Sequence, residues 1–262
     1  MVVGSGPAGM EAARVAAFRG HDVSLHEAKP VLGGGQLALA KAPPFKEKLN
    51  WLEEYLTHQL QDLPVKMHLG SVVTATEVEE EQPDVLVVAT GAVPLIPDIP
   101  GIAGDNVVTA FSVLDGEPVV EGKQVVVLGG QRVGTETAEY LTMRGNAVTI
   151  VTRSPVPQVA ADAPPNYREA LLQRLDNAGV RFIGEHDVKE ISLDGLALVG
   201  PNDDERFLPA DLVVVARGAV PQRSLADGVE DMVEEVYVVG DSREPRTIAE
   251  AMYEGTMVGR RI

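Results

Sequence analysis

Residues 2–9 read VVGSGPAG, a pair of β-branched residues followed by a glycine-rich turn. In the pattern GxGxxG, the first glycine permits a tight turn, the second lets the backbone approach a pyrophosphate, and the third lets a helix pack against the strand. Gly4, Gly6 and Gly9 supply all three. The stretch therefore predicts a strand, a turn and a helix whose N-terminus offers unpaired N–H groups to phosphates.

An acidic residue strengthens this prediction. Glu27 ends the next apolar stretch, 18 residues after Gly9, where a carboxylate can accept hydrogen bonds from both ribose hydroxyls of an adenosine. The combination predicts a site for a dinucleotide or another ADP-containing ligand. A tight packing turn without a ligand is the alternative. Four neighbouring residues complete the predicted contacts: Ser5, Pro7, Ala8 and Ala28.

The same pattern returns 125 positions later, where residues 124–134 read QVVVLGGQRVG. The shift places Gly4 on Gly129 and Gly9 on Gly134. Each copy continues through a helical stretch into a second apolar strand, which is the pattern of a βαβ unit. The predicted fold class is therefore α/β, with two Rossmann-like, three-layer dinucleotide-binding domains.

The second copy departs from the first at two places. Gln131 stands where the first copy has Gly6, and its side chain could crowd a ligand or turn aside and donate a hydrogen bond. Thr152 replaces Glu27 and precedes Arg153, so a 2′-phosphate meets no carboxylate and can pair with a guanidinium. This favours NADPH over NADH; the alternative is an exposed arginine on a fold that binds nothing. The other predicted contacts are Gly129, Gly130, Val133, Gly134 and Gly218.

Further repeats indicate how the two domains are connected. Residues 82–94 (QPDVLVVATGAVP) and 209–221 (PADLVVVARGAVP) match, and each predicts the closing strand of one sheet. Residues 235–255 predict a strand, a Gly-Asp turn and a helix that have no counterpart in the second copy, so we expect them to return to the first domain. The second domain is then inserted into the first. The predicted boundaries are 1–111 with 236–262 for the first, discontinuous domain, and 112–235 for the second; the resemblance given below implies FAD for the first and NAD(P) for the second.

Between these landmarks, apolar periodicity predicts amphipathic helices over residues 46–60 and 167–178. Residues 72–80 (VVTATEVEE) are predicted to be strand-like, and the acidic run 77–84 is predicted to be a solvated hairpin tip.

Composition narrows the possible functions. The net charge of -17 disfavours nucleic acid and anionic membrane as partners. The absence of cysteine excludes disulfides, thiolate metal sites and a CxxC redox relay within these 262 residues. The five histidines lack metal-ligand spacing, so no catalytic side chain and no metal ligand is predicted. The apolar runs are well below the roughly 20 residues of a membrane helix, and no signal sequence is recognised, which makes a cytoplasmic location the expectation.

The first glycine turn follows only three residues. A buried parallel strand usually has about five. Two interpretations stay open: a short native strand, or a module that continues from a longer polypeptide.

Taken in order, several motifs resemble one family. GSGPAG (4–9), GGQ (34–36), ATG (89–91) and VVGDSREPRTIAEAMYEG (238–255) resemble the flavoproteins with two dinucleotide-binding domains. More narrowly, the chain is similar to the C-terminal half of the 2,4-dienoyl-CoA reductase, enoate reductase and trimethylamine dehydrogenase group. The resemblance covers nearly the whole chain. It implies FAD in the first domain, NADPH or NADH in the second, and hydride transfer from the nucleotide to the flavin.

The resemblance also assigns residues from several separate loops to FAD. It places the pyrophosphate on Gly4, Gly6, Ala8 and Gly9, and the adenosine ribose on Glu27. The remaining assignments are Gly35 and Gln36 near the flavin, Val73 by the adenine, Thr90 and Gly91 along the cofactor, Asp241 at its ribityl or phosphate end, and Thr247 at the start of a helix directed at the flavin.

Two functions are consistent with these observations. The first is an NAD(P)H oxidoreductase module that passes electrons to an external acceptor: a partner subunit, a fused barrel, a quinone or oxygen. Members of the group carry a barrel with FMN and an iron–sulfur cluster, which makes such a barrel a candidate partner. The second is a non-redox module that holds only ADP, as in the trimethylamine dehydrogenase branch. A disulfide reductase of the thioredoxin or glutathione type is excluded because the chain has no cysteine.

Overall fold

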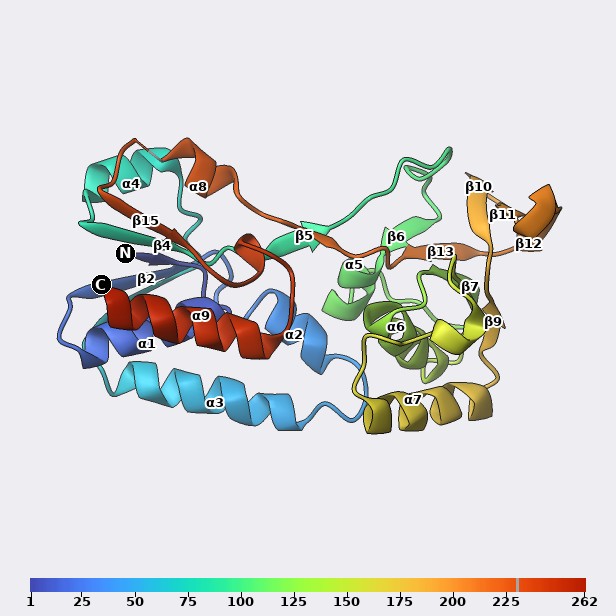
Figure 1. Ribbon diagram of the computed structural model, residues 1–262, viewed down its shortest axis with the longest axis horizontal. Coiled ribbons are helices and arrows are strands. Elements are labelled where there is room, and N and C mark those ends of the chain that lie inside the picture. Colours follow the sequence, from blue (N-terminus) through green and yellow to red (C-terminus); the bar gives the residue numbers. More distant parts are fainter. Residues whose placement is uncertain (230) are drawn as a thin grey trace. The chain divides into compact units, whose positions relative to one another are not determined.

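The computed structural model describes residues 1–229 and 231–262, which divide into two compact units (Figure 1). Unit 1 comprises residues 1–41, 45–93 and 219–262, and unit 2 comprises residues 42–44 and 94–218. Each unit is built on a parallel sheet, and unit 2 is inserted into the sequence of unit 1. The predicted α/β fold class with two Rossmann-like domains is confirmed.

The chain leaves and re-enters unit 1 earlier than the predicted boundaries at 111/112 and 235/236. Strand β6 (Val107–Thr109) already pairs with the sheet of unit 2. After unit 2, β14 (Ala219–Pro221) pairs with β5 (Ala92–Pro94), and α8 (Ser224–Gly228) buries Ala226 in an apolar cluster of unit 1. Periodicity could not reveal this, because strands of three residues carry no signal of which sheet they join.

The sheet of unit 1 has five parallel strands in the order β15-β4-β1-β2-β3. Val3 is in register with His26 and Val88, so the carboxyl ends of the three central strands meet at one edge. The last strand of the chain lies beside β4, which confirms that the C-terminal segment returns to this unit. The strands are β1 (Val2–Val3), β2 (Val23–Glu27), β3 (Val65–Leu69), β4 (Val85–Val88) and β15 (Glu235–Val238).

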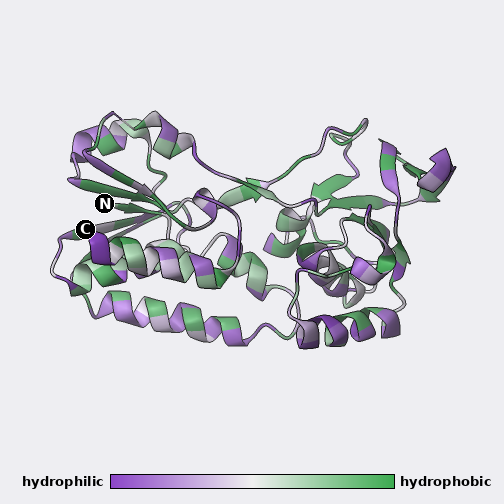
Figure 2. Cartoon of the chain, in the orientation of Figure 1, coloured by the Kyte–Doolittle hydropathy of each residue, from purple (hydrophilic) through white to green (hydrophobic). Residues whose placement is uncertain are grey.

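Helices cover both faces of this sheet (Figure 1). One face carries α1 (Pro7–Phe18), α3 (Lys48–Gln61) and α9 (Ile248–Arg261); the other carries α4 (Ala75–Glu81) and α8. Helices α1 and α9 approach closely, since a Cβ on Gly255 would lie 2.4 Å from the carbonyl oxygen of Ala8. Green and purple segments alternate along α3 and α9 in Figure 2, as expected of helices with one buried side. Two short elements complete the unit: α2 (Gln36–Lys41) and the 3-10 turn η3 (Gly240–Ser242).

Helix α4 corrects one prediction. Residues 75–81 are helical, whereas the sequence suggested a strand-like piece and a hairpin tip. Thr74 accepts a hydrogen bond from the Glu77 backbone N–H, and the Glu77 carboxylate accepts one from the Thr74 N–H. This capping box is a local helix-start signal that outweighs the β-branched residues before it.

The sheet of unit 2 has the order β6-β13-β7-β8-β9, again parallel throughout. Helix α6 packs against β7 and β8, and an antiparallel meander packs its apolar residues on Val126, Leu128 and Val213. The parallel strands not yet given are β7 (Gln124–Leu128), β8 (Ala147–Val151), β9 (Arg181–Ile183) and β13 (Leu212–Val215). The meander is β10 (Asp187–Ser192), β11 (Gly195–Val199) and β12 (Glu205–Pro209).

The helices of unit 2 are α5 (Ala110–Asp115), α6 (Arg132–Thr142) and α7 (Pro165–Asn177), with 3-10 turns η1 (Val156–Gln158) and η2 (Pro201–Asp203). The amphipathic helices predicted over 46–60 and 167–178 are confirmed as α3 and α7.

Candidate functional site

In the glycine turn between β1 and α1, two glycines have no room for a side chain and the third has open space around it. Gly4 has φ +100°, and a Cβ there would lie 2.3 Å from the Ala89 carbonyl oxygen. A Cβ on Gly9 would lie 1.8 Å from the Gly4 carbonyl oxygen. Gly6 has an ordinary extended backbone, φ -67° and ψ 178°, and nothing lies within 4 Å of its Cβ position. Packing within the fold therefore requires glycine at 4 and 9 but not at 6.

The N-terminus of α1 has free hydrogen-bonding capacity. Gly6 is the N-cap and supplies no capping side chain, and Pro7 at the next position has no N–H. The first backbone bond of the helix runs from the Met10 N–H to the Gly6 carbonyl at 2.9 Å. The N–H groups of Ala8 and Gly9 thus have no acceptor within the helix, and the helix dipole adds partial positive charge there. This end of α1 can bind an anion.

Glu27 holds the glycine turn in place through hydrogen bonds to Ser5. Its Oε2 accepts hydrogen bonds from the Ser5 N–H at 2.8 Å and the Ser5 hydroxyl at 2.7 Å, and its Oε1 accepts one from the Lys29 N–H at 2.8 Å. The side chain is buried, while the neighbouring Ala28 is exposed. A carboxylate offers about four acceptor positions, so one remains for a ribose hydroxyl. The sequence predicted the position of this carboxylate but not its bonds to Ser5.

Three loops that follow strands of unit 1 come together at the same edge of the sheet. The Gln36 side-chain amide donates to Asp241 Oδ2 at 2.7 Å, and the Gly91 N–H donates to the Ser242 hydroxyl at 2.7 Å. The Thr90 hydroxyl donates to the Gln222 carbonyl at 2.8 Å. Gly35 and Gly91 have positive φ angles, 63° and 79°. The structure therefore places together the residues that the resemblance assigns to the flavin end of a cofactor.

Asp241 is the titratable group of this cluster. Burial raises the pKa of its carboxyl, and hydrogen bonds from the Arg246 backbone and the Gln36 side chain oppose that rise. The Arg246 N–H donates to Asp241 Oδ1 at 3.0 Å. The carboxylate thus receives a donor on each oxygen, which fixes its orientation.

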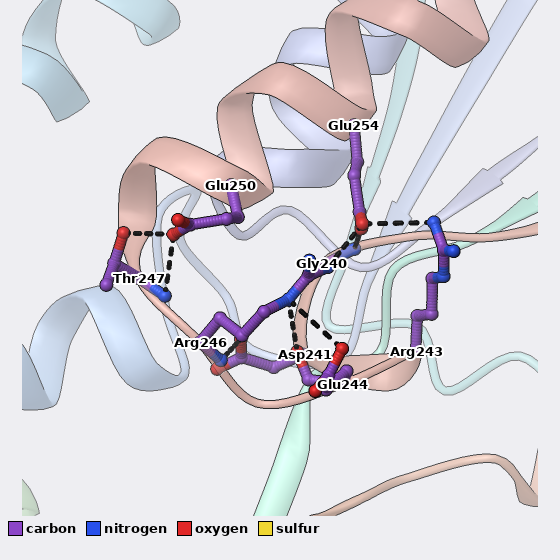
Figure 3. A network of polar contacts seen from close by, with 8 residues as sticks. All are labelled: Gly240, Asp241, Arg243, Glu244, Arg246, Thr247, Glu250 and Glu254. Atoms are coloured by element: carbon purple, nitrogen blue, oxygen red, sulfur yellow. Dashed lines mark hydrogen bonds and ion pairs between the residues drawn. The ribbon is translucent and has the colours of Figure 1, made fainter.

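A polar network holds the segment between this aspartate and α9 (Figure 3). Glu254, which is buried, accepts from the Gly240 N–H at 2.8 Å, from Arg243 at 3.1 Å and from the Arg246 guanidinium. The sequence did not identify this glutamate, because a helix of alternating polarity gives no sign that one carboxylate reaches back to a loop.

Thr247 begins α9 with a capping box. Its N–H donates to Glu250 at 3.1 Å (Figure 3). Its hydroxyl accepts a hydrogen bond from the Ala249 N–H at 3.2 Å. Val73 lies elsewhere, half-buried against the apolar cluster that also contains Val78 of α4. The contacts of Thr247 and Val73 with a cofactor stay predictions.

The glycine turn of unit 2 repeats the same packing. A Cβ on Gly129 would lie 2.1 Å from the Ala216 carbonyl oxygen, and one on Gly134 would lie 2.0 Å from the Gly129 carbonyl oxygen. Gln131, the N-cap of α6, is exposed and has extended backbone angles, φ -85° and ψ -177°. It makes no capping bond with its own side chain.

A carboxylate occupies the start of α6. Asp162 Oδ1 accepts a hydrogen bond from the Arg132 N–H at 2.8 Å, and the Ala160 N–H donates to the Gly130 carbonyl at 2.7 Å. The loop after β8 therefore folds onto the second glycine turn and brings a negative charge to the position where a phosphate is expected. The two copies differ in this respect, because no side chain caps α1.

Residues at the end of β8 and β13 complete the second site. Thr152 is buried, and its Cβ lies 3.0 Å from where a Cβ on Gly130 would be. Arg153 and Val133 are exposed. Gly218 has φ +102° with open space around its Cβ position. Thr152 and Arg153 thus follow β8 at the same sheet edge as the glycine turn.

The described part of the chain contains neither a metal-type cluster of side chains nor a membrane-spanning helix. Residues 1–229 and 231–262 contain no group of three or more histidine or acidic side chains placed to hold a metal ion. The helices in these ranges are too short or too polar to span a bilayer.

Comparison with known proteins defines the class. The family model of the pyridine nucleotide-disulphide oxidoreductases matches residues 1–255, and the chain belongs to this family. The members of this family are flavoprotein oxidoreductases.

The chain is 37% identical over 266 residues to NADH oxidase from Thermoanaerobacter brockii, covering 100% of this chain and 40% of that protein. It is 36% identical over 244 residues to bilirubin reductase from Mediterraneibacter gnavus, covering 93% and 37%. The structure of 2-naphthoyl-CoA reductase in complex with 2-naphthoyl-CoA matches with a TM-score of 0.93 and 32% identity, covering 100% and 39%. The predicted resemblance is confirmed. The chain spans about 40% of the length of these relatives.

Proposed function

We propose that the chain is the module of a larger flavoenzyme that oxidises a pyridine nucleotide, with FAD in unit 1 and NADH or NADPH in unit 2. Family membership supports FAD and a pyridine nucleotide as the cofactors. The observation that carries the proposal is the open turn at Gly6, which faces an uncapped helix N-terminus and is backed by the buried Glu27.

The residues present fit FAD. A bare backbone at Gly6 leaves room for a pyrophosphate, and the N–H groups of Ala8 and Gly9 can donate to it. The free acceptor position of Glu27 suits a ribose hydroxyl. At the other end of the cofactor, Asp241 and Gln36 form a hydrogen-bonded pair. Gly91 lies beside them with a positive φ angle and no side chain, so it presents only backbone to the site.

When bound, FAD supplies the redox chemistry by accepting a hydride from the pyridine nucleotide and passing the electrons on. The chain's own residues bind and orient. Asp241 would accept hydrogen bonds from cofactor hydroxyls, and the N–H groups at the start of α9 would offer partial positive charge that favours a negatively charged flavin. The proposed hydride transfer requires no acid, base or nucleophile of the chain, because the cofactors supply the chemistry.

In unit 2, we assign the nucleotide to Gly129, Gly130, Gly134 and the ends of β8 and β13. Thr152 in place of a carboxylate and Arg153 beside it support NADPH over NADH. The relatives are about two and a half times as long, as the shared 40% indicates. A fused or separate barrel domain with FMN and an iron–sulfur cluster is therefore our candidate for the electron acceptor, and a cytoplasmic location is part of the proposal.

One observation favours a second function. Asp162 caps α6 and Gln131 carries a side chain at the second glycine turn, so unit 2 could have lost its nucleotide while unit 1 keeps ADP as a structural ligand.

An anaerobic absorption spectrum separates the two functions. The purified chain is reconstituted with FAD, freed of excess cofactor and mixed with NADPH or NADH without oxygen. We expect a yellow protein that bleaches, and faster bleaching by NADPH. A colourless protein that rejects FAD and releases ADP on denaturation would instead support the structural module.

A further inference from the structure

Arg217, the second residue after β13, has a mostly buried side chain with one unused hydrogen-bond donor. Its side chain is 10% exposed and donates from Nη2 to Asp187 Oδ1 at 3.0 Å. Its Nε is fully buried and has no hydrogen-bond partner in the part of the chain that the structure describes. An arginine buried to this extent normally has its donors paired, because leaving them unpaired is costly.

The position of Arg217 connects it to the second glycine turn. The carbonyl oxygen of the preceding residue, Ala216, lies 2.1 Å from where a Cβ on Gly129 would be, so Arg217 follows at the carboxyl edge of the sheet beside the turn. Asp187 begins β10, directly after His186, whose backbone N–H donates to the Thr152 carbonyl at 3.1 Å. The ion pair therefore reaches from the end of β13 towards the end of β8, where Arg153 follows Thr152.

The charges at this edge are not balanced. Arg217 and Arg153 are close enough to repel, and Asp187, which is 47% exposed, is the carboxylate paired with Arg217. Burial lowers the pKa of the Arg217 guanidinium, Asp187 opposes the shift, and Arg153 adds to it. Two arginines thus act at this edge against one paired carboxylate, Asp187, while the charge of Asp162 acts at the start of α6. Around the Arg217 guanidinium, positive charge is in excess. Such an excess attracts an anion.

We propose that Arg217 is a phosphate-binding residue of unit 2 that acts with Arg153 on a phosphate group of the pyridine nucleotide. Asp187 holds the guanidinium in place and competes for it. This inference rests on the proposed function, because it assumes that unit 2 binds the nucleotide. The phosphate can be the 2′-phosphate or part of the pyrophosphate, because both present pairs of oxygens that the planar guanidinium can bind with two parallel hydrogen bonds.

The test uses the FAD-loaded chain, so that unit 1 is filled, and isothermal titration with 2′,5′-ADP and with ADP. Arg217→Met removes the guanidinium and should weaken binding about ten-fold or more, since a charge-assisted pair is lost. Asp187→Asn frees the guanidinium and should tighten binding. Lys123→Met removes an exposed cation just before β7, at the opposite edge of the sheet, and should change binding little.

The signs of these effects decide the outcome. Opposite effects of Arg217→Met and Asp187→Asn on affinity support the proposal. If Arg217→Met weakens 2′,5′-ADP alone, the contact is with the 2′-phosphate. If it weakens ADP equally, the contact is with the pyrophosphate. If the wild-type chain binds both ligands and neither variant alters them, Arg217 is only a structural partner of Asp187 and the proposal is overturned while the proposed function stands. If the FAD-loaded wild type binds neither ligand, the nucleotide site in unit 2 fails and the role of Arg217 fails with it. Arg217→Lys keeps the positive charge and serves as the second variant if Arg217→Met does not fold.

Discussion

Gly6→Ala separates binding from folding. The structure leaves open space around the Cβ position of Gly6, and its backbone angles are ones that alanine adopts without strain. The added methyl group would stand where we propose that the pyrophosphate approaches. We therefore expect a protein that folds normally and binds FAD poorly.

The expected change in folding stability is small because two effects oppose each other. Replacing glycine by alanine at a compatible position stabilises a protein by about 0.4–1 kcal/mol through the unfolded chain. Alanine is a poorer N-cap than glycine, which costs roughly 0.5–1 kcal/mol. The free energy of unfolding should thus stay within about 1 kcal/mol of the wild type. Loss of one charge-assisted hydrogen bond, worth about 1.5–3 kcal/mol, would weaken FAD at least ten-fold.

Gly9→Ala is the matched control. Its Cβ would lie 1.8 Å from the Gly4 carbonyl oxygen, so the backbone must move and the fold should lose about 1–3 kcal/mol or more. Urea unfolding of the FAD-free proteins gives the stabilities, and quenching of flavin fluorescence gives the dissociation constants. A Gly6→Ala protein that binds FAD as tightly as wild type, or that unfolds as readily as Gly9→Ala, would refute the reasoning.

Three further outcomes are expected. Arg153→Ala should weaken NADPH by about ten-fold and spare NADH in titrations of the FAD-loaded chain; equal losses for both would count against a 2′-phosphate contact. Asp162→Asn keeps a capping side chain but removes the negative charge at α6, so nucleotide affinity should rise by about five-fold at low salt, equivalent to about 1 kcal/mol; an unchanged affinity would mean that the phosphates bind elsewhere. Burial raises the pKa of the Asp241 carboxyl, so its contribution to stability is present below the unfolded value of about 3.9 and is lost as the pH rises through the raised folded value. Asp241→Asn should accordingly stabilise the FAD-free chain near neutral pH, with a gain in urea midpoint that shrinks towards pH 4; a constant gain would point to another cause.

The sequence predicted those parts of the site that depend on backbone constraints. Gly4 and Gly9 are required because carbonyl oxygens lie where their side chains would be, and the spacing to Glu27 is set by one helix and one strand. These constraints act over short stretches of chain, so a pattern of residues reports them. The insertion of unit 2 was predictable for the same reason, because the repeat marks both copies.

Contacts made by loops could not be predicted in this way. Asp162 reaches the start of α6 from 30 residues away, and Arg217 meets Asp187 across the same number of positions. Neither pair follows a helical or strand period. The prediction for residues 72–80 was wrong because β-branched residues were given more weight than the capping box at Thr74.

The two glycine turns have the same steric frame, in which a carbonyl oxygen fills the side-chain position of the first and third glycine. Only the middle position is exempt, since nothing crowds Gly6 and Gln131 is accepted in its place. The first and third glycines are therefore required by packing, and a copy that no longer binds a nucleotide would still need them. In related sequences, the residue at the middle position of the turn and the group that caps the following helix should therefore distinguish turns that bind a nucleotide from turns that do not.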